Sequence, residues 1–234
     1  MIYFLDSANT EDWRELMPCG CFSGITTNPL LLRKAALNFD LGVFRNLLAQ
    51  AGNYPGAAIY FQTKGEACEE ILKSANELLT LGKIRLKIPF SAEGIKAASI
   101  LKRKGAYILM TGVYTAEQCS LALATGLPEV AVYHGRILKE YGEGEEMIRD
   151  IAGFSARNPE LKILMASLKT PAIVGKLAAA GFNRFTVSPE IARGILNNPF
   201  SLRDAAEFNT AAANQEATTS PPEPTPENHK SEQN

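Results

Sequence analysis

The chain has 234 residues, 46% hydrophobic and 21% charged, which is enough to bury the core of one ordinary domain or two small ones. Its 24 Lys and Arg residues nearly balance 25 Asp and Glu residues, and a formal net charge of -1 argues against a nucleic-acid or anionic-membrane binder. No apolar run approaches the roughly 18 residues of a membrane span, and residues 1–6 lack the basic start of a secretory signal. Four cysteines are too few for a disulfide scaffold, so we expect a cytoplasmic protein.

Short apolar runs recur along the chain, and a segment with helical periodicity follows each one. The expected strands cover residues 2–5, 23–26, 57–61, 84–88, 107–110, 130–133, 162–166 and 184–187. The expected helices begin near residue 8 and then cover 39–51, 65–81, 92–104, 115–125, 145–154, 171–180 and 189–196.

Strict alternation of strands and helices predicts a parallel sheet. Eight such units in about 200 residues favour an α/β fold of the (β/α)8 TIM-barrel type, near the small end of its size range. The alternative is a doubly wound open sheet, which typically has a glycine-rich phosphate loop after its first strand. The segment Asp6-Ser7-Ala8-Asn9 stands there without a glycine, so we prefer the barrel.

The end of the chain has a different composition. Residues 209–234 contain no Leu, Ile, Val, Met or aromatic residue, and 218–226 are rich in Pro, Ser and Thr. Nothing in this stretch can offset the entropy cost of ordering, so we predict a barrel domain over 1–208 and a disordered tail over 209–234. A role as a Pro-rich ligand is the alternative to a solvated tail.

Polar side chains stand at nearly every predicted strand end. The active site of a barrel lies at the C-terminal face of its strands, so these residues are candidates for function. Any one of them could instead be an ordinary strand-end or helix-capping residue. They are Asp6, Thr26, Asn28, Gln62, Lys87, Thr111, Tyr133, Arg136, Ser167, Thr186 and Ser188.

Lys87 is the most informative of these residues. It lies between Leu86 and Ile88, so the two apolar residues share one face of the strand while Lys87 and Arg85 share the other. If the apolar face meets the outer helices, Lys87 points into the barrel and loses hydration. Desolvation favours the neutral amine, which is the form that a Schiff-base nucleophile needs. Arg85 lies one layer deeper and requires a carboxylate partner that the sequence does not identify.

Five segments in chain order match the motifs of a known family. They begin at Phe4, Gly24, Lys87, Thr111 and Ala166, with the sequences FLDSAN, GITTNP, KIPFSAEG, TGVY (with Gln118 following) and ASLKTP. By these motifs the chain resembles the transaldolase family, in its small form close to fructose-6-phosphate aldolase. The resemblance spans residues 1–198 and implies a (β/α)8 barrel with class I aldol chemistry, without a metal or other cofactor.

The same resemblance implies roles for five catalytic residues. Lys87 would form a Schiff base with a donor ketone such as dihydroxyacetone, and Asp6 would orient or deprotonate a substrate hydroxyl. Tyr133, Gln62 and Thr111 would place the water that relays protons to the intermediate.

It also implies the substrate contacts and an assembly. Thr26, Asn28 and Ser167 would hold donor hydroxyls, and Arg136 would bind the phosphate of a sugar-phosphate acceptor. Ring-like homo-oligomers, pentamers or their pairs, are typical of the family. Two departures concern the acceptor side: Gly112 replaces the usual alanine, and Ile137-Leu138 lacks an aspartate often found after the arginine.

Two positions separate the subgroups of the family. Transaldolases proper have a glutamate in place of Gln62 and a phenylalanine in place of Tyr133. A phenol can act as an acid or base, so this pair favours an aldolase that reversibly cleaves fructose 6-phosphate to dihydroxyacetone and glyceraldehyde 3-phosphate. The alternatives are a transaldolase of the pentose phosphate pathway, which moves a dihydroxyacetone unit between sugar phosphates, and a catalytically silent barrel.

Two further alternatives concern other residues. One is His134 as a general base, and the other is a zinc site at Cys19-Gly20-Cys21.

Overall fold

A computed structural model describes residues 1–219 of the chain. Its internal contacts divide the chain into a unit of residues 1–194 and a second unit that begins at Ile195. In the first unit eight parallel strands pair in sequence order, and β8 pairs with β1 to close a barrel. The predicted (β/α)8 fold is confirmed. The strands are β1 (Ile2–Asp6), β2 (Phe22–Thr26), β3 (Ala58–Gln62), β4 (Arg85–Pro89), β5 (Ile108–Val113), β6 (Glu129–Tyr133), β7 (Lys162–Ala166) and β8 (Arg184–Val187).

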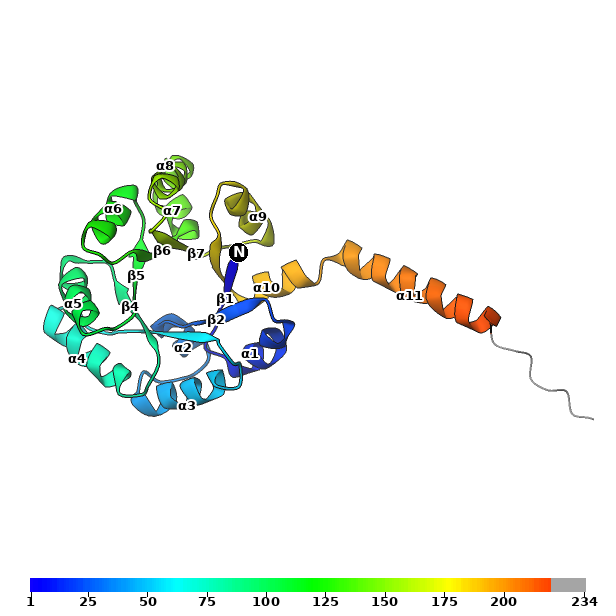
Figure 1. Cartoon of the computed structure of the whole chain (residues 1–234), viewed down its shortest axis with the longest axis horizontal. Helices are drawn as coiled ribbons and strands as arrows, with labels where there is room; N and C mark the ends of the chain where they lie inside the picture. Colours follow the sequence, from blue (N-terminus) through cyan, green and yellow to red (C-terminus); the bar gives the residue numbers. More distant parts are fainter. Residues whose placement is uncertain (220–234) are drawn as a thin grey trace, which may run out of the picture. The chain divides into compact units, whose positions relative to one another are not determined.

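The helices that connect the strands lie outside the ring of strands (Figure 1). The short helices α2 and α7 were not expected, because each is only six or seven residues long and presents less than two turns of periodicity. The helices are α1 (Thr10–Leu16), the 3₁₀ helix η1 (Met17–Cys19), α2 (Pro29–Lys34), α3 (Leu41–Ala51), α4 (Cys68–Leu79), α5 (Ala92–Arg103), α6 (Ala116–Ala124), α7 (His134–Glu140), α8 (Gly144–Arg157), α9 (Pro171–Ala179) and α10 (Pro189–Leu196).

Two apolar clusters lie on the two sides of the strands. Leu86 and Ile88 belong to the larger one, in which strand residues pack against helix residues such as Leu101. The smaller cluster fills the inside of the barrel and is formed by Phe4, Tyr60, Leu109, Ala131 and Leu164. These interior side chains form a packed layer, so the barrel is not a pore.

The second unit contains α11 (Pro199–Thr219), which continues past Phe208, where we expected the ordered part of the chain to end. Alanine is the best helix former, and Ala205, Ala206 and Ala211–Ala213 support a helix without apolar burial. Residues 209–219 are thus helical in the structure, and the disorder of the tail stays a prediction. The Pro-rich stretch from 220 onward lies outside the described residues. No helix in the described part of the chain is long and apolar enough to cross a bilayer.

Candidate active site at the C-terminal ends of the strands

Lys87 points into the barrel, as its alternation with Leu86 and Ile88 predicts. Its register partner on β5 is Leu109, which belongs to the interior cluster. The Lys87 side chain is only 4% exposed, and no hydrogen bond or ion pair joins its amine to another residue of the described chain. A buried lysine without a carboxylate partner is costly for folding, so the position is better explained by chemistry than by packing.

Gln62 lies beside Lys87 on the neighbouring strand. It is the last residue of β3, and the register of the two strands pairs it with Lys87. Its side chain is partly exposed. The structure therefore brings the predicted nucleophile and the predicted water-holding amide to one level of the barrel.

Asp6 stands at the end of β1 in a chain of hydroxyl groups. The Thr26 hydroxyl donates to Asp6 Oδ1 at 2.6 Å and also lies 2.6 Å from the Thr186 hydroxyl. Because the single proton of Thr26 goes to the carboxylate, Thr186 must donate to Thr26. Thr26 is fully buried, so the structure supports a role for it in holding Asp6, while its contact with a donor hydroxyl stays a prediction. Thr186, a strand-end residue for which the sequence predicted no role, completes the chain.

Thr111 and Tyr133 form a second polar group across β5 and β6. Their hydroxyl oxygens lie 2.8 Å apart. The register shifts between Thr111 and Val113, so Gly112 is the extra residue of a β-bulge, and its φ of 74° is one that glycine adopts without strain. The departure from alanine at this position therefore coincides with a local change in backbone geometry beside Thr111.

Arg136 lies on the exposed side of Tyr133, in the first turn of α7. Its guanidinium carbon is 4.6 Å from the centroid of the Tyr133 ring, and Nη1 donates a long 3.5 Å hydrogen bond to the Tyr114 hydroxyl. No ion pair within residues 1–215 engages Arg136. Two tyrosines thus contact Arg136, and no carboxylate among the described residues neutralises its positive charge. Tyr114 was part of a matched motif, but no role was predicted for it.

Ser167 follows β7 with a φ of 58°, one of two non-glycine residues with positive φ among the described residues. Such backbone strain is typical of functional positions. Its carbonyl oxygen accepts a hydrogen bond from the Gly135 amide at 3.1 Å. A Cβ on Gly135 would lie 2.3 Å from that oxygen, so only glycine allows this contact. The contact brings the loop of Ser167 to the start of α7, next to Tyr133.

Asn28 caps a helix. Its Oδ1 accepts hydrogen bonds from the amides of Leu30 and Leu31, at 2.9 and 3.0 Å, at the start of α2. The capping alternative that the sequence left open is thus present in the structure. Only the side-chain amide N–H groups at Nδ2 of Asn28 are left to donate to a hydroxyl of the donor substrate, as the family resemblance predicts.

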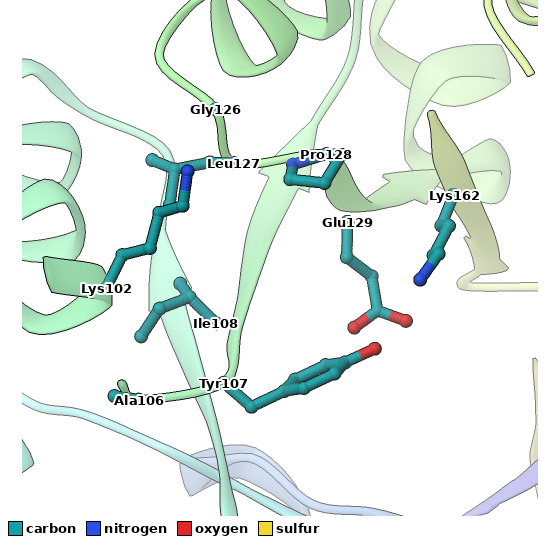
Figure 2. Close-up of a pocket in the computed structure, with 9 residues that line it drawn as sticks. All are labelled: Lys102, Ala106, Tyr107, Ile108, Gly126, Leu127, Pro128, Glu129 and Lys162. Carbon is teal, nitrogen blue, oxygen red and sulfur yellow. The ribbon is translucent and has the colours of Figure 1, made fainter. Parts of the chain in front are cut away.

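The partner of Arg85 lies at the N-terminal end of the strands, opposite the candidate active site. Arg85 donates to the Tyr60 hydroxyl at 2.7 Å, and Tyr60 lies 3.4 Å from the carboxylate of Glu129, which is ion-paired with Arg184. Burial and the Glu129 charge raise the pKa of Tyr60. Figure 2 shows Glu129 beside the Tyr107 hydroxyl in a cavity of about 160 Å³ at this end. Within the described residues no hydrogen bond or ion pair joins this network to Lys87, and at the N-terminal face of a barrel such groups serve stability.

Comparison with known proteins identifies the family of the chain. Residues 3–223 match the family model described as transaldolase/fructose-6-phosphate aldolase. A probable transaldolase from Symbiobacterium thermophilum is 32% identical over 86% of this chain and 92% of its own length. Probable transaldolases from Methanococcus maripaludis and Clostridioides difficile are 29% and 30% identical, each over 89% of this chain and 95% of their own lengths.

Proposed function

Because the chain belongs to the transaldolase/fructose-6-phosphate aldolase family and is an enzyme of that type, we propose that it is a class I aldolase acting on fructose 6-phosphate. The observation that carries the proposal is Lys87, an inward, buried lysine with no ion-pair partner among the described residues. The Lys87 amine adds to the ketone carbon of the substrate, a proton taken up from solvent lets the carbonyl oxygen leave as water, and an iminium ion forms.

The polar groups around Lys87 supply the proton transfers. Asp6, supported by Thr26, takes the proton of the substrate hydroxyl while the carbon–carbon bond breaks and glyceraldehyde 3-phosphate leaves. The remaining enamine is protonated through a water held by Gln62, Thr111 and Tyr133. Hydrolysis of the iminium then releases dihydroxyacetone and restores the lysine.

The choice of aldolase over transaldolase rests on Gln62 and Tyr133. Tyr133 has a hydroxyl hydrogen-bonded to Thr111, so it offers a proton-transfer group that phenylalanine lacks. The names of the relatives support the second candidate, transfer of a dihydroxyacetone unit to another sugar phosphate. Steady-state release of glyceraldehyde 3-phosphate from fructose 6-phosphate, with and without erythrose 4-phosphate, separates the two. We expect turnover without the acceptor, and strict dependence on the acceptor would favour the transaldolase.

The nucleophile is tested independently of the substrate. We expect incubation with dihydroxyacetone followed by borohydride to leave one covalent adduct on Lys87, seen by peptide mass spectrometry. Lys87→Met abolishes the adduct, whereas Lys83→Met, which changes an exposed lysine four residues earlier, does not. An adduct on any other lysine contradicts the assignment.

We expect the enzyme to work in the cytoplasm as a homo-oligomer, on family grounds alone. Sedimentation velocity of the full chain tests the oligomer, and a monomeric species at micromolar concentration would contradict it.

A further inference from the structure

His134 is a buried side chain that the proposed reaction does not use. It follows Tyr133 directly, but it lines a groove between α8 and α9, and no hydrogen bond within the described residues joins its ring to the polar groups at the strand ends. The residue is 4% exposed. Burial lowers its pKa against the opposing effect of the Glu145 carboxylate, so the buried position favours the neutral ring. This placement gives no support to the general-base alternative for His134.

The imidazole of His134 is incompletely satisfied by the protein. Its Nδ1 is closed off from solvent and has no hydrogen-bond partner in the described chain. A buried N–H without an acceptor is rarer in proteins than an acceptor without a donor, which favours the tautomer with its proton on Nε2. Nε2 has no hydrogen-bond partner in the described chain either, but it is not closed off from solvent, so it is the ring nitrogen that can face the groove. The groove is therefore offered a hydrogen-bond donor.

The rest of the groove has apolar walls and a charged rim. We call it the α8–α9 groove; its cavity is about 280 Å³ and its walls include Ile148, Ile173 and Leu177. Glu145 and Arg149 on α8 and Lys176 on α9 also line it, so two cations face one carboxylate. No ion pair within residues 1–215 engages Arg149 or Lys176. An apolar pocket with a few convergent polar groups is the usual form of a small-molecule site.

We propose that the α8–α9 groove binds a small organic anion, such as a short-chain carboxylate. Its acidic group accepts a hydrogen bond from Nε2 of His134 and lies near Arg149 and Lys176, while its short apolar body packs on the walls. The net positive charge disfavours a cation, and the apolar walls distinguish the ligand from inorganic phosphate.

The chain offers a direct probe of this site, because His134 and His229 are its only histidines. We would follow the ring signals of the full-length protein labelled with [ε1-¹³C]histidine, assigned with the variant His229→Gln, during titration with butyrate. We expect a saturable shift of the His134 signal with a Kd of about 5 mM or lower, and no shift with butylamine. Inorganic phosphate should bind at least about fivefold more weakly than butyrate.

Surface variants make the result specific to the groove. Lys176→Met and Arg149→Met should each raise the Kd for butyrate at least about fivefold. Lys73→Met, a matched exposed lysine on α4, should leave it unchanged. The absence of a saturable His134 shift up to about 50 mM butyrate overturns the proposal, as do an equal shift with butylamine and an unchanged Kd in both groove variants.

Discussion

The hydroxyl oxygens of Thr111 and Tyr133 lie 2.8 Å apart, although the two residues are 22 positions apart in the chain. One comes from β5 and the other from the end of β6, and the bulge at Gly112 lies immediately beside the contact. A phenol fixed by a neighbouring hydroxyl is oriented before substrate binds, which is the usual requirement for a general acid or base.

Tyr133→Phe removes the phenol hydroxyl while preserving the ring that packs against Arg136. General acid–base groups contribute about 10²–10⁴-fold, so we expect kcat for fructose 6-phosphate cleavage to fall by about 10²-fold or more. The borohydride-trapped adduct on Lys87 should persist, because the amine is untouched. Tyr54→Phe, far from this pair in sequence, is the control. An unchanged kcat in Tyr133→Phe would remove Tyr133 from the proton relay.

Tyr114 is expected to position Arg136. Tyr114 contacts both the Arg136 guanidinium and, with ring centroids 6.1 Å apart, the Tyr133 ring. Tyr114→Leu leaves the guanidinium without this support, so KM for fructose 6-phosphate should rise about threefold to tenfold with little change in kcat. With unphosphorylated fructose the two enzymes should behave alike, because no phosphate engages Arg136. An equal loss on both substrates would indicate general damage to the fold.

The contact between Gly135 and Ser167 predicts that a side chain at position 135 lowers kcat/KM. In Gly135→Ala the new Cβ would fall 2.3 Å from the Ser167 carbonyl oxygen, so the first turn of α7 must move away. Misplacement of catalytic groups by about 1 Å can cost about 10²-fold in rate, and we expect a loss of at least about tenfold in kcat/KM. At Gly142 a Cβ meets open space, so Gly142→Ala serves as the control. Wild-type kcat/KM in a folded Gly135→Ala protein would show that the close contact between Gly135 and the Ser167 carbonyl oxygen is unimportant for activity.

The strands and the ring of polar strand ends were predictable because they depend on local periodicity. Alternation around Lys87 predicted which way it points, and the register with Leu109 confirms it. The partner of Arg85 was not predictable, because Glu129 reaches it only through Tyr60 and the closure of the barrel. The support of Arg136 by Tyr114 likewise depends on how α7 leaves β6, which no periodic pattern encodes.

Acid should weaken the protein partly through Glu190. Hydrogen bonds from Ser188, from its own amide and from Lys34 hold the pKa of Glu190 down to about 2, against an ordinary value of 4.5. The folded state favours the carboxylate, so the stabilisation is complete above about pH 4.5 and is lost as pH falls through about 2. Because the Glu190 side chain is 62% exposed, we expect at most about 1 kcal/mol.

Glu190→Gln tests this assignment by urea unfolding at several pH values. The variant should be less stable than the natural protein at pH 7, and the difference should disappear toward pH 2. Glu160→Gln, an exposed position, should show no such trend. A difference that is the same at all pH values would mean that Glu190 acts through packing and not through its charge.

Glu129 should be essential for stability and dispensable for chemistry. Its carboxylate is 3% exposed and pairs with Arg184, and Arg85 is bonded to Tyr60 beside it. Glu129→Gln leaves buried guanidinium charge without its counter-ion, so the free energy of unfolding should fall by about 3–5 kcal/mol. Adding Arg184→Met should recover part of this loss, because it removes the unpaired charge. Trapping of dihydroxyacetone per folded molecule should stay unchanged, since no hydrogen bond or ion pair within the described residues joins Glu129 to Lys87. If folded Glu129→Gln protein lost the Lys87 adduct, the two ends of the barrel would have to be coupled.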